Sequence, residues 1–383
     1  MAAVRILACA SEAPRAPLNG SRLVLHELLP RIAARAELTV LALRRPDQEG
    51  PAPTGFELLE LALGDPAPAR SWALRGAALA LREPVEARRL ATPFQRALPA
   101  LLARRRFDAA HVTLGSLAGL APALGGLPAL IAPLDAWHLN VRAEAERAQG
   151  AEQVWRRQQE RAVRRWEANA YRPFKRVVLV TDEDARQVAE LDPTLQVVTI
   201  PNGVDADHFT PRNAPRGDGI LFTGALDAPS NATAATRLVH RIMPLVRREL
   251  PDATLTIVGR SPGPEVRALG GVVADVPDLR PWLWGAAVYA CPMESGTGIK
   301  NKLLEAMAAG APSVATPLAC QGINASHALV AVSDADFAAA LVELLRDPAR
   351  AARLAEGARA YVRARHDWDA VAAAYLALYE EIA

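Results

Sequence analysis

The sequence lacks a large excess of either charge: 44 Lys and Arg residues oppose 42 Asp and Glu residues, which leaves a formal net charge of +2. Nucleic-acid binding draws on clustered phosphate contacts, so this balance argues against a nucleic-acid partner and confines any basic patch to a local segment. Near the start, MAAVRILACASEAP is apolar for only about six residues, too short for a signal-peptide core or a membrane span. This run predicts a first strand.

Cysteine is also scarce. Cys9, Cys291 and Cys320 form no CxxC pair, and two of them lie in apolar runs. An odd number without metal-ligand spacing favours reduced, buried thiols over a disulfide framework or a metal site. We therefore expect a cytoplasmic protein. Aromatic residues make up only 5% of the chain, which predicts cores of aliphatic helices packed on aliphatic strands.

What the sequence does have is a regular alternation of short apolar runs with longer segments of helical period. With 383 residues the chain is long enough for two domains. The alternation predicts parallel strands joined by crossover helices in each half. The predicted strands are VRILACA, ELTVLAL, FELLELAL, FDAAHVT, ALIAP, RVVLV and QVVTIP in the first half, and GILFTGA, ATLTIVG, GGVVAD, AVYACP, APSVAT and ALVAVS in the second.

Between the halves lies PNGVDADHFTPRNAPRGDG, where Pro, Asn, Gly and Asp crowd together and apolar periodicity disappears. We expect an N-terminal α/β domain over 1–204, a linker over 205–217, a C-terminal α/β domain over 218–365 and a final helix over 366–383. The Pro-rich segment 82–99 is poorly periodic and predicts surface loops around short helices.

The most informative stretch is CPMESGTGIKNKLLEAMAAGAPSVAT, which predicts a strand, a glycine loop, a helix over about 299–309 and a second strand. Gly296 and Gly298 permit close backbone approach, and the helix would direct free N–H groups and its positive dipole end into the loop. Lys300 and Lys302 add mobile cations there, and Glu305 is placed one turn later to accept hydrogen bonds from a ribose diol. The alternative is a simple turn with solvated lysines, but the combination favours a diphosphate site.

This segment resembles the donor-site signature of glycosyltransferase family 4, in which a Lys precedes LEAMA.G.PVVAT. IPNGVDADHF, ILFTGALDAPSN and ATLTIVGRSPGPEVR resemble other blocks of the family. FTGALD, VGRSP and GTGIKNKLLEAMA are most similar to sugar transferases associated with exosortase and exopolysaccharide systems. The resemblance is strong over residues 176–322 and loose in the first half, where it rests on GSRLVLHEL.

The resemblance implies a GT-B fold: two Rossmann-like domains face across a cleft, and the final helix crosses back to the N-terminal domain. It implies transfer, with retention, of a sugar from a nucleotide-diphosphate sugar to a glycan, lipid-linked or other hydroxyl acceptor, in cell-surface or exopolysaccharide synthesis. The donor would bind the C-terminal domain and the acceptor the N-terminal one. No metal or other cofactor is expected, because the lysines would neutralise the diphosphate.

The sequence departs from the family at two positions of the donor site. Thr297 stands where many members have the first of two glutamates, so Glu294 or the Thr297 hydroxyl would have to replace that contact. Ala225 stands where an Arg is frequent, which leaves the charge to the lysines and Arg260. The donor-binding residues so implied in the C-terminal domain are Gly224, Asp227, Asn231, Arg260, Val276, Glu294, Thr297, Gly298, Ile299, Lys300, Lys302, Leu303 and Glu305. For Asn231, capping of the next helix is an equal alternative.

In the N-terminal domain, Gly20 and Arg22 follow the first strand at the start of a helix and could approach the donor phosphate. Asp135 follows the strand ALIAP at its C-terminal end, where open α/β sheets bind ligands, and similar transferases carry an Asp there; we assign it as the catalytic base. His138 and His111 are its competitors. We interpret His111 as a core histidine and His138 as an exposed one.

The segment 142–176 contains ten basic residues against five glutamates, with Trp155 and Trp166 interleaved. This excess would suit docking on an anionic membrane at its inner face, where lipid-linked acceptors reside. The alternative is a solvated helix whose tryptophans face the core. Three D-x-D patterns, at 182–184, 205–207 and 334–336, are better explained by capping than by a metal.

Two other functions stay open at this point. A sugar-nucleotide epimerase on the same fold would consume the donor without any acceptor. A catalytically inactive scaffold subunit of a polysaccharide assembly complex is favoured by the missing Glu and Arg. A pyridoxal-phosphate-dependent phosphorylase is disfavoured because the chain, at 383 residues, is short for that class.

Overall fold

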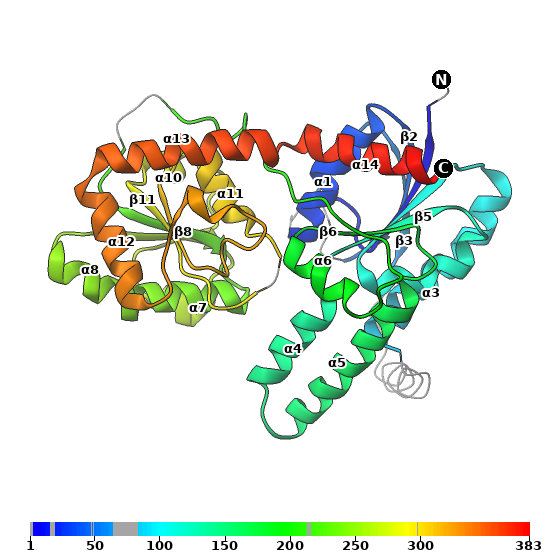
Figure 1. The fold of residues 1–383 in the computed structure, drawn as a ribbon, viewed down its shortest axis with the longest axis horizontal. Helices are drawn as coiled ribbons and strands as arrows, with labels where there is room; N and C mark the ends of the chain where they lie inside the picture. The colour runs from blue at the N-terminus through cyan, green and yellow to red at the C-terminus, as the bar shows by residue number, and fades with distance from the viewer. Residues whose placement is uncertain are drawn as a thin grey trace. The chain divides into compact units, whose positions relative to one another are not determined.

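The computed structural model describes residues 3–15, 20–46, 48, 50–63, 83–212, 216–296 and 298–383. The chain divides into two compact units (Figure 1). The first contains Met1–Pro201 together with Trp368–Ala383, and the second contains Asn202–Asp367. Each unit is a parallel sheet covered by helices on both faces, the arrangement that buries apolar strands completely.

The first unit is built on a seven-stranded sheet of order β3-β2-β1-β4-β5-β6-β7 over the described residues. Every recorded strand pair in it is parallel. The order reverses direction between β1 and β4, which creates a switch point at the carboxyl ends of these strands. The strands are β1 (Arg5–Ala10), β2 (Glu37–Arg44), β3 (Glu57–Ala62), β4 (Ala109–Thr113), β5 (Ala129–Leu134), β6 (Arg176–Leu179) and β7 (Val197–Thr199).

Strand β1 shows how the sequence fills both faces of this sheet. Ile6, Ala8 and Ala10 belong to one apolar cluster and Leu7 and Cys9 to another, as the two-residue period of a strand requires. The helices of the unit are α1 (Gly20–Ala33), α3 (Val85–Arg104), the 3₁₀ segment η1 (Gly115–Leu124), α4 (Trp137–Arg147), α5 (Gly150–Ala170), α6 (Asp182–Ala189) and α14 (Trp368–Ile382).

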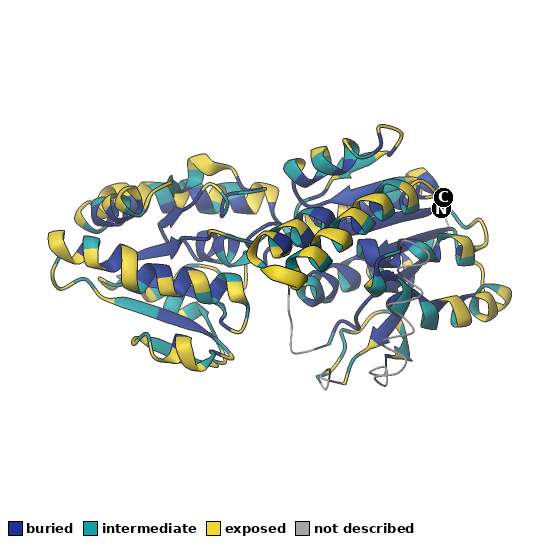
Figure 2. Ribbon diagram, turned by 90° about the horizontal axis from the view of Figure 1, so that it is seen from below, coloured by how far each residue is buried: buried dark blue, intermediate teal, exposed yellow. Residues whose placement is uncertain are grey.

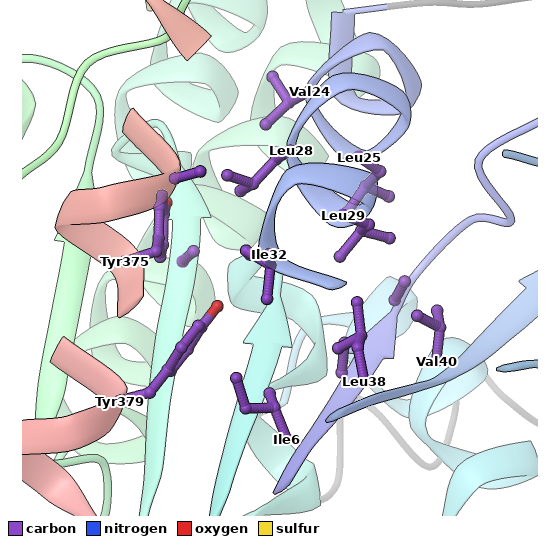
Figure 3. Packing of buried hydrophobic residues seen from close by; sticks show 14 of the residues in the cluster. Ile6, Val24, Leu25, Leu28, Leu29, Ile32, Leu38, Val40, Tyr375 and Tyr379 are labelled. Carbon is purple, nitrogen blue, oxygen red and sulfur yellow. The ribbon is translucent and has the colours of Figure 1, made fainter. Parts of the chain in front are cut away.

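The first cluster lies beneath α1 and α14, which are neighbours in space although opposite ends of the chain supply them (Figures 1 and 3). Figure 3 shows Tyr375 and Tyr379 of α14 on one side of this core and Leu28 and Ile32 of α1 on the other. All four side chains are buried. The final helix therefore completes the first unit, and the prediction that it returns to the N-terminal domain is confirmed.

The second unit repeats the design with a six-stranded sheet of order β10-β9-β8-β11-β12-β13, again parallel over the described residues. Its switch point lies between β8 and β11. The strands are β8 (Ile220–Ala225), β9 (Leu255–Arg260), β10 (Val272–Ala274), β11 (Val288–Cys291), β12 (Ser313–Ala315) and β13 (Leu329–Val330).

Helices cover both faces of this second sheet, and Figure 2 shows the buried strands enclosed by helices with exposed outer faces. They are α7 (Pro229–Arg237), the π-helical turn η2 (Leu238–Ile242), α8 (Met243–Glu249), α9 (Pro264–Arg267), α10 (Arg280–Gly285), α11 (Asn301–Ala308), the 3₁₀ turn η3 (Ala325–His327), α12 (Asp334–Arg346) and α13 (Pro348–Arg365). Every strand predicted from the sequence is present, and the two Rossmann-like units are confirmed.

One prediction about the first unit was wrong. Residues 85–99, expected to form loops around short helices, belong to the single helix α3, which contains Pro93 and Pro99. Its buried side chains, Leu90, Phe94 and Leu98, recur every four residues and pack into the second core cluster. This tertiary burial offsets the hydrogen bonds that the prolines remove. Residues 64–82 lie outside the described part of the chain.

The three cysteines are free and buried, as predicted. None of the helices among the described residues is long and apolar enough to cross a membrane. The D-x-D patterns at 182–184 and 334–336 lie at helix starts: Thr181 caps α6 by accepting the Asp184 N–H at 3.0 Å, and Ser333 forms a capping box with Asp336. Within the described ranges, no group of three or more His, Cys, Asp or Glu residues is placed to hold a metal.

Candidate functional site

The site is built at the switch point of the second sheet, where β8 and β11 end and α11 begins. The loop from β11 to α11 contains Gly296 at φ 104° and Gly298 at φ 67°, conformations that glycine adopts without the strain a side chain would add. Lys300 is the N-cap residue of α11, and its side chain does not cap the helix. The first N–H groups of α11 are therefore directed toward the glycine loop. Thr297 lies outside the described residues.

Lys302 supplies the cation of this site. Its Nζ donates a hydrogen bond to Asn231 Oδ1, lies 3.9 Å from Met293 Sδ and stands 5.4 Å from the centroid of the Phe222 ring. A Cβ added to Gly224 would come within 3.3 Å of this ammonium group, so a glycine at the end of β8 leaves the lysine its room. Burial lowers the pKa of Lys302. A half-buried ammonium is thus held at the end of β8 by a neutral amide.

Asn231 is the residue that orients this lysine. Its Nδ2 donates to the backbone oxygen of Ala225 at 2.8 Å while its Oδ1 accepts from Lys302. Helix α7 begins after Ala228 without any side-chain cap. Of the two alternatives left open by the sequence, the structure therefore favours the contact at the site over helix capping.

Lys300 behaves differently from Lys302. Its side chain is buried, and Nζ donates to the backbone oxygens of Gly298 at 2.6 Å and Gly296 at 3.2 Å. The ammonium group thus braces the glycine loop from inside and adds positive charge beneath it. The sequence predicts a mobile cation at this position, and the burial of Lys300 shows that this prediction is wrong.

Glu305 lies on α11, one turn after Lys302, and is half-buried. Burial raises the pKa of its carboxyl to about 6, and the charge of Lys302 opposes this rise. The neighbouring Ile299 and Leu303 are buried among apolar residues. The Leu303 N–H also donates to the Lys300 oxygen at 2.8 Å, so this residue serves the core and the start of α11.

Glu294 faces a cluster of charges that sequence reasoning missed. Its Oε1 lies 3.5 Å from Arg237 Nε and 3.7 Å from Arg241 Nη1, and both arginines also bond to Asp334. Arg237 is buried and donates to the backbone oxygen of Pro292 at 2.9 Å, which fixes the start of the glycine loop. The only sequence signal is an arginine among small residues on α7, too weak to have identified it.

Three further predicted residues follow or end neighbouring strands at the same edge of the sheet. Arg260 ends β9 beside Ala225 of β8 and is half-buried. Asp227 follows β8 and is exposed, and Val276 follows β10 and is half-buried. The carboxyl ends of parallel strands meet at one edge, so these positions lie on the same edge of the sheet as the glycine loop. Their role as donor ligands stays a prediction.

In the first unit, Gly20 begins α1, and an added Cβ would meet nothing within 4 Å among described atoms. Arg22 is buried instead of free to move: its Nε donates to Glu12 Oε2 at 3.0 Å, and Arg45 approaches the same carboxylate at 2.9 Å. Its guanidinium charge is therefore partly compensated within the first unit. This lowers its value as a phosphate ligand.

Asp135 follows β5 directly and is half-buried, after Leu134 at the unusual φ of 73°. His111 is a core histidine as predicted: its Nδ1 lies 2.7 Å from the Tyr379 hydroxyl, and burial lowers its pKa to about 3. His138, expected to be exposed, is buried, and its Nδ1 lies 2.6 Å from Glu167 Oε2. The expectation for His138 was wrong because Glu167, 29 residues later, packs onto it.

Both units of the chain match models of known protein families. A model described as glycosyltransferase family 4 matches residues 18–208, and a model of glycosyl transferases group 1 matches residues 217–347. The chain belongs to the family 4 glycosyltransferases. The two matches fall on the first and second units in turn, so the family resemblance covers both sheets.

Curated relatives of this family 4 chain include a phosphatidyl-myo-inositol mannosyltransferase from Mycolicibacterium smegmatis, 35% identical over 206 residues that cover 48% of this chain and 52% of the relative. A GDP-mannose-dependent alpha-(1-6)-phosphatidylinositol monomannoside mannosyltransferase from Mycobacterium tuberculosis is 29% identical over 222 residues, 49% of this chain and 57% of the relative. The chain spans about half the length of the curated relatives it matches.

Solved structures resemble the family 4 chain over nearly its whole length. Sucrose-phosphate synthase from Thermosynechococcus elongatus has a TM-score of 0.75 at 18% identity and covers 98% of both chains. HepE from Anabaena, solved in complex with UDP, has a TM-score of 0.65 at 12% identity and covers 99% of this chain and 100% of its own. WaaG, a glycosyltransferase involved in lipopolysaccharide biosynthesis, has a TM-score of 0.67 at 15% identity, with 98% and 99% covered. At these identities the likeness shows the GT-B fold alone.

Proposed function

We propose that the protein transfers a sugar from a nucleotide-diphosphate sugar to a hydroxyl of a glycan or lipid-linked acceptor, with retention and without a metal. Mannose is the first sugar to test, because the curated relatives are named as mannosyltransferases. The nucleobase of the donor stays open, since one relative is named for GDP-mannose and one fold neighbour was solved with UDP. Cell-surface or exopolysaccharide synthesis is the expected setting.

The observation that carries this proposal is the position of Lys302. A half-buried ammonium bonded to a neutral amide stands at the switch point of a parallel sheet, beside the N-terminus of α11. Anions bind at such helix ends because free N–H groups and the dipole favour negative charge. The diphosphate would lie on the Gly298 loop, stiffened by Lys300 from below, and Glu305 would accept hydrogen bonds from the ribose.

In the proposed reaction, the acceptor oxygen forms a bond to the anomeric carbon on the same face from which the diphosphate leaves, as retention in one displacement requires. The bond from that carbon to the phosphate oxygen breaks at the same time. The electron pair of the broken bond stays with the nucleoside diphosphate, and the acceptor proton passes to Asp135. Negative charge therefore grows on the diphosphate, where Lys302 and the helix end bind it more strongly than in the ground state. This compensation takes the place of a divalent ion.

The test incubates the purified protein with GDP-mannose in EDTA, with and without phosphatidylinositol vesicles, and follows GDP release and labelled lipid. If the protein is a transferase, GDP release and the labelling of the lipid should both occur only when phosphatidylinositol is present. Conversion of the donor into another nucleotide sugar without acceptor would identify an epimerase. Tight donor binding without turnover on any glycan or lipid acceptor would favour the scaffold role.

Donor affinity should depend on pH through Glu305. The pKa of this carboxyl is raised to about 6, and only the carboxylate accepts hydrogen bonds from both ribose hydroxyls. Affinity for GDP-mannose should therefore increase as the pH rises through about 6, by up to about tenfold from pH 5 to 7. Calorimetric titration at several pH values measures this, because the diphosphate diester of the donor does not titrate in that range. Glu305→Gln should bind weakly at every pH; a slope retained in that variant would contradict the assignment.

We further propose that α4 and α5, which lie side by side as a hairpin (Figure 1), contact an anionic membrane. Trp166 is anchored to the core, since its Nε1 donates to the backbone oxygen of Gly115 at 2.9 Å, so it supports the solvated-helix alternative. Other parts of α5 favour docking. This helix has an exposed basic face that consists of Arg157, Arg161, Arg164 and Arg165. These arginines form no ion pair with the described residues, and the exposed Val154 lies beside them in the sequence.

Neutralising part of this basic face should weaken membrane binding. Each arginine near an anionic surface contributes about 1 kcal/mol, so Arg161→Gln with Arg165→Gln should lower vesicle affinity about thirtyfold at low salt. Vesicle sedimentation with anionic lipid measures the change. The control is Arg346→Gln with Arg350→Gln, which removes the same charge from the second unit. An equal loss of vesicle affinity in both double variants, or no binding by the wild type at low ionic strength, would contradict the proposal that this face binds the membrane.

A further inference from the structure

We propose that His138, held by the buried Glu167, binds a hydroxyl of the acceptor through its Nε2 atom. This inference rests on the proposed transfer reaction and assigns part of its acceptor site. It concerns the carboxyl edge of the first sheet, where α4 follows β5 and where open α/β sheets bind their ligands.

Glu167 is fully buried on α5 and reaches across to the start of α4. Its carboxylate accepts the backbone N–H of Trp137 at 2.8 Å and of His138 at 3.2 Å, and it lies 2.6 Å from His138 Nδ1. The N-cap position of α4 is Ala136, which has no side-chain acceptor. Glu167 therefore caps α4 from another helix. Capping explains the two hydrogen bonds from the backbone. It does not explain the third contact, between Glu167 and His138 Nδ1, which fixes the orientation of the imidazole.

The third bond decides which nitrogen of the ring can accept a hydrogen bond. A carboxylate that already takes two backbone donors acts as an acceptor, so His138 Nδ1 carries the hydrogen and donates it. The Tyr171 hydroxyl, 3.5 Å from Glu167, has its pKa raised well above the usual value, first by burial and then by that carboxylate, and stays neutral. In the neutral ring, Nε2 is left with a free lone pair.

No described side chain of the protein uses that lone pair. The His138 side chain is only 4% exposed. Within the described part of the chain, the imidazole contacts Glu167 through Nδ1, and Nε2 has no hydrogen-bond partner. A buried, oriented imidazole that presents one acceptor atom at a ligand edge suits a neutral O–H donor.

The position of His138 relative to Asp135 indicates the class of ligand. Asp135 follows β5 directly, and His138 comes three residues later at the same sheet edge. Two hydrogen-bond acceptors so placed fit an acceptor with neighbouring hydroxyls, such as a sugar or an inositol ring. In this arrangement Asp135 receives the proton of the reacting hydroxyl, His138 holds a hydroxyl of the same molecule, and Glu167 positions the imidazole.

The decisive variant is His138→Asn. The asparagine amide can still donate to Glu167 in place of Nδ1 but has no atom in place of Nε2. Melting temperature and GDP-mannose affinity should match the wild type, whereas the KM for phosphatidylinositol in mixed vesicles should rise about tenfold, the value of one hydrogen bond. An unchanged acceptor KM in this folded variant would overturn the inference and leave a structural cap.

A second variant covers the case in which His138→Asn does not fold. Glu167→Gln keeps an oxygen for the Trp137 N–H but presents its amide N–H to His138, which forces the ring proton from Nδ1 onto Nε2. Acceptor KM should rise as in His138→Asn, with donor affinity retained; a wild-type KM would refute the role of the tautomer. If the wild type transfers no sugar, the proposed function fails and this inference with it, whereas transfer with an unaltered KM in the variants removes the inference alone.

Discussion

Lys302→Ala should lower turnover about a hundredfold with GDP-mannose as donor. The ammonium group stands at the end of β8, oriented by Asn231, and would meet the diphosphate as its charge grows. Removing one such charged contact from a partly buried site costs about 3 kcal/mol in the transition state. Because the contact strengthens during bond cleavage, the loss in kcat should exceed the loss in donor affinity. Steady-state kinetics with calorimetric titration of the donor separates the two.

Two variants make the Lys302 result specific. Lys175→Ala removes an exposed lysine of the first unit and should leave kcat unchanged. Asn231→Ala keeps the cation but removes its hydrogen-bond partner, so it should reduce kcat less than Lys302→Ala does. Wild-type kinetics in Lys302→Ala would show that the cation does not act on the leaving group.

Asp135→Asn should lower turnover by about a hundredfold while donor affinity changes less than twofold. The carboxylate follows β5 in the first unit and is proposed to take the acceptor proton, a role worth two or more orders of magnitude in rate. Asparagine preserves the size of the side chain but cannot accept a proton. Turnover number and donor Kd, measured on the same preparation, check the expectation.

The control for Asp135 is Asp252→Asn, which alters an exposed aspartate of the second unit outside the site and should leave turnover unchanged. A turnover number unchanged by Asp135→Asn would remove this residue from the mechanism. An equal loss of donor affinity and turnover would instead make it a donor ligand. In both cases the search for a proton acceptor would return to His138.

Much of the fold could be predicted because its determinants are local. Strands of a parallel sheet are buried on both faces, so segments such as LTIVGR and VYAC appear as short apolar runs that a pattern search finds. The glycine loop before α11 was predictable for the same reason, since its glycines, lysines and helix lie within one segment. Helix α3 was missed because its stability comes from burial against a distant core, which its prolines conceal.

The parts of the site that the sequence did not predict join residues far apart in the chain. Asn231 and Lys302 are 71 residues apart, and only the register of β8 beside β11 brings them together. His138 meets Glu167 because α4 and α5 fold back on each other. Lys300 points into its own loop, an orientation that spacing along the chain does not encode. Spacing predicts which residues share an element, but tertiary packing sets their partners.

The central claim is that the cationic end of α11 holds a nucleotide-sugar diphosphate without a metal. It is tested most directly by calorimetric titration of the wild-type protein with nucleotide sugars, GDP-mannose first and UDP-glucose next, in buffer with EDTA. The account predicts saturable binding at one site, weakened in Lys302→Ala. Absence of binding for every nucleotide sugar, or binding that appears only when a divalent ion is added, would contradict it.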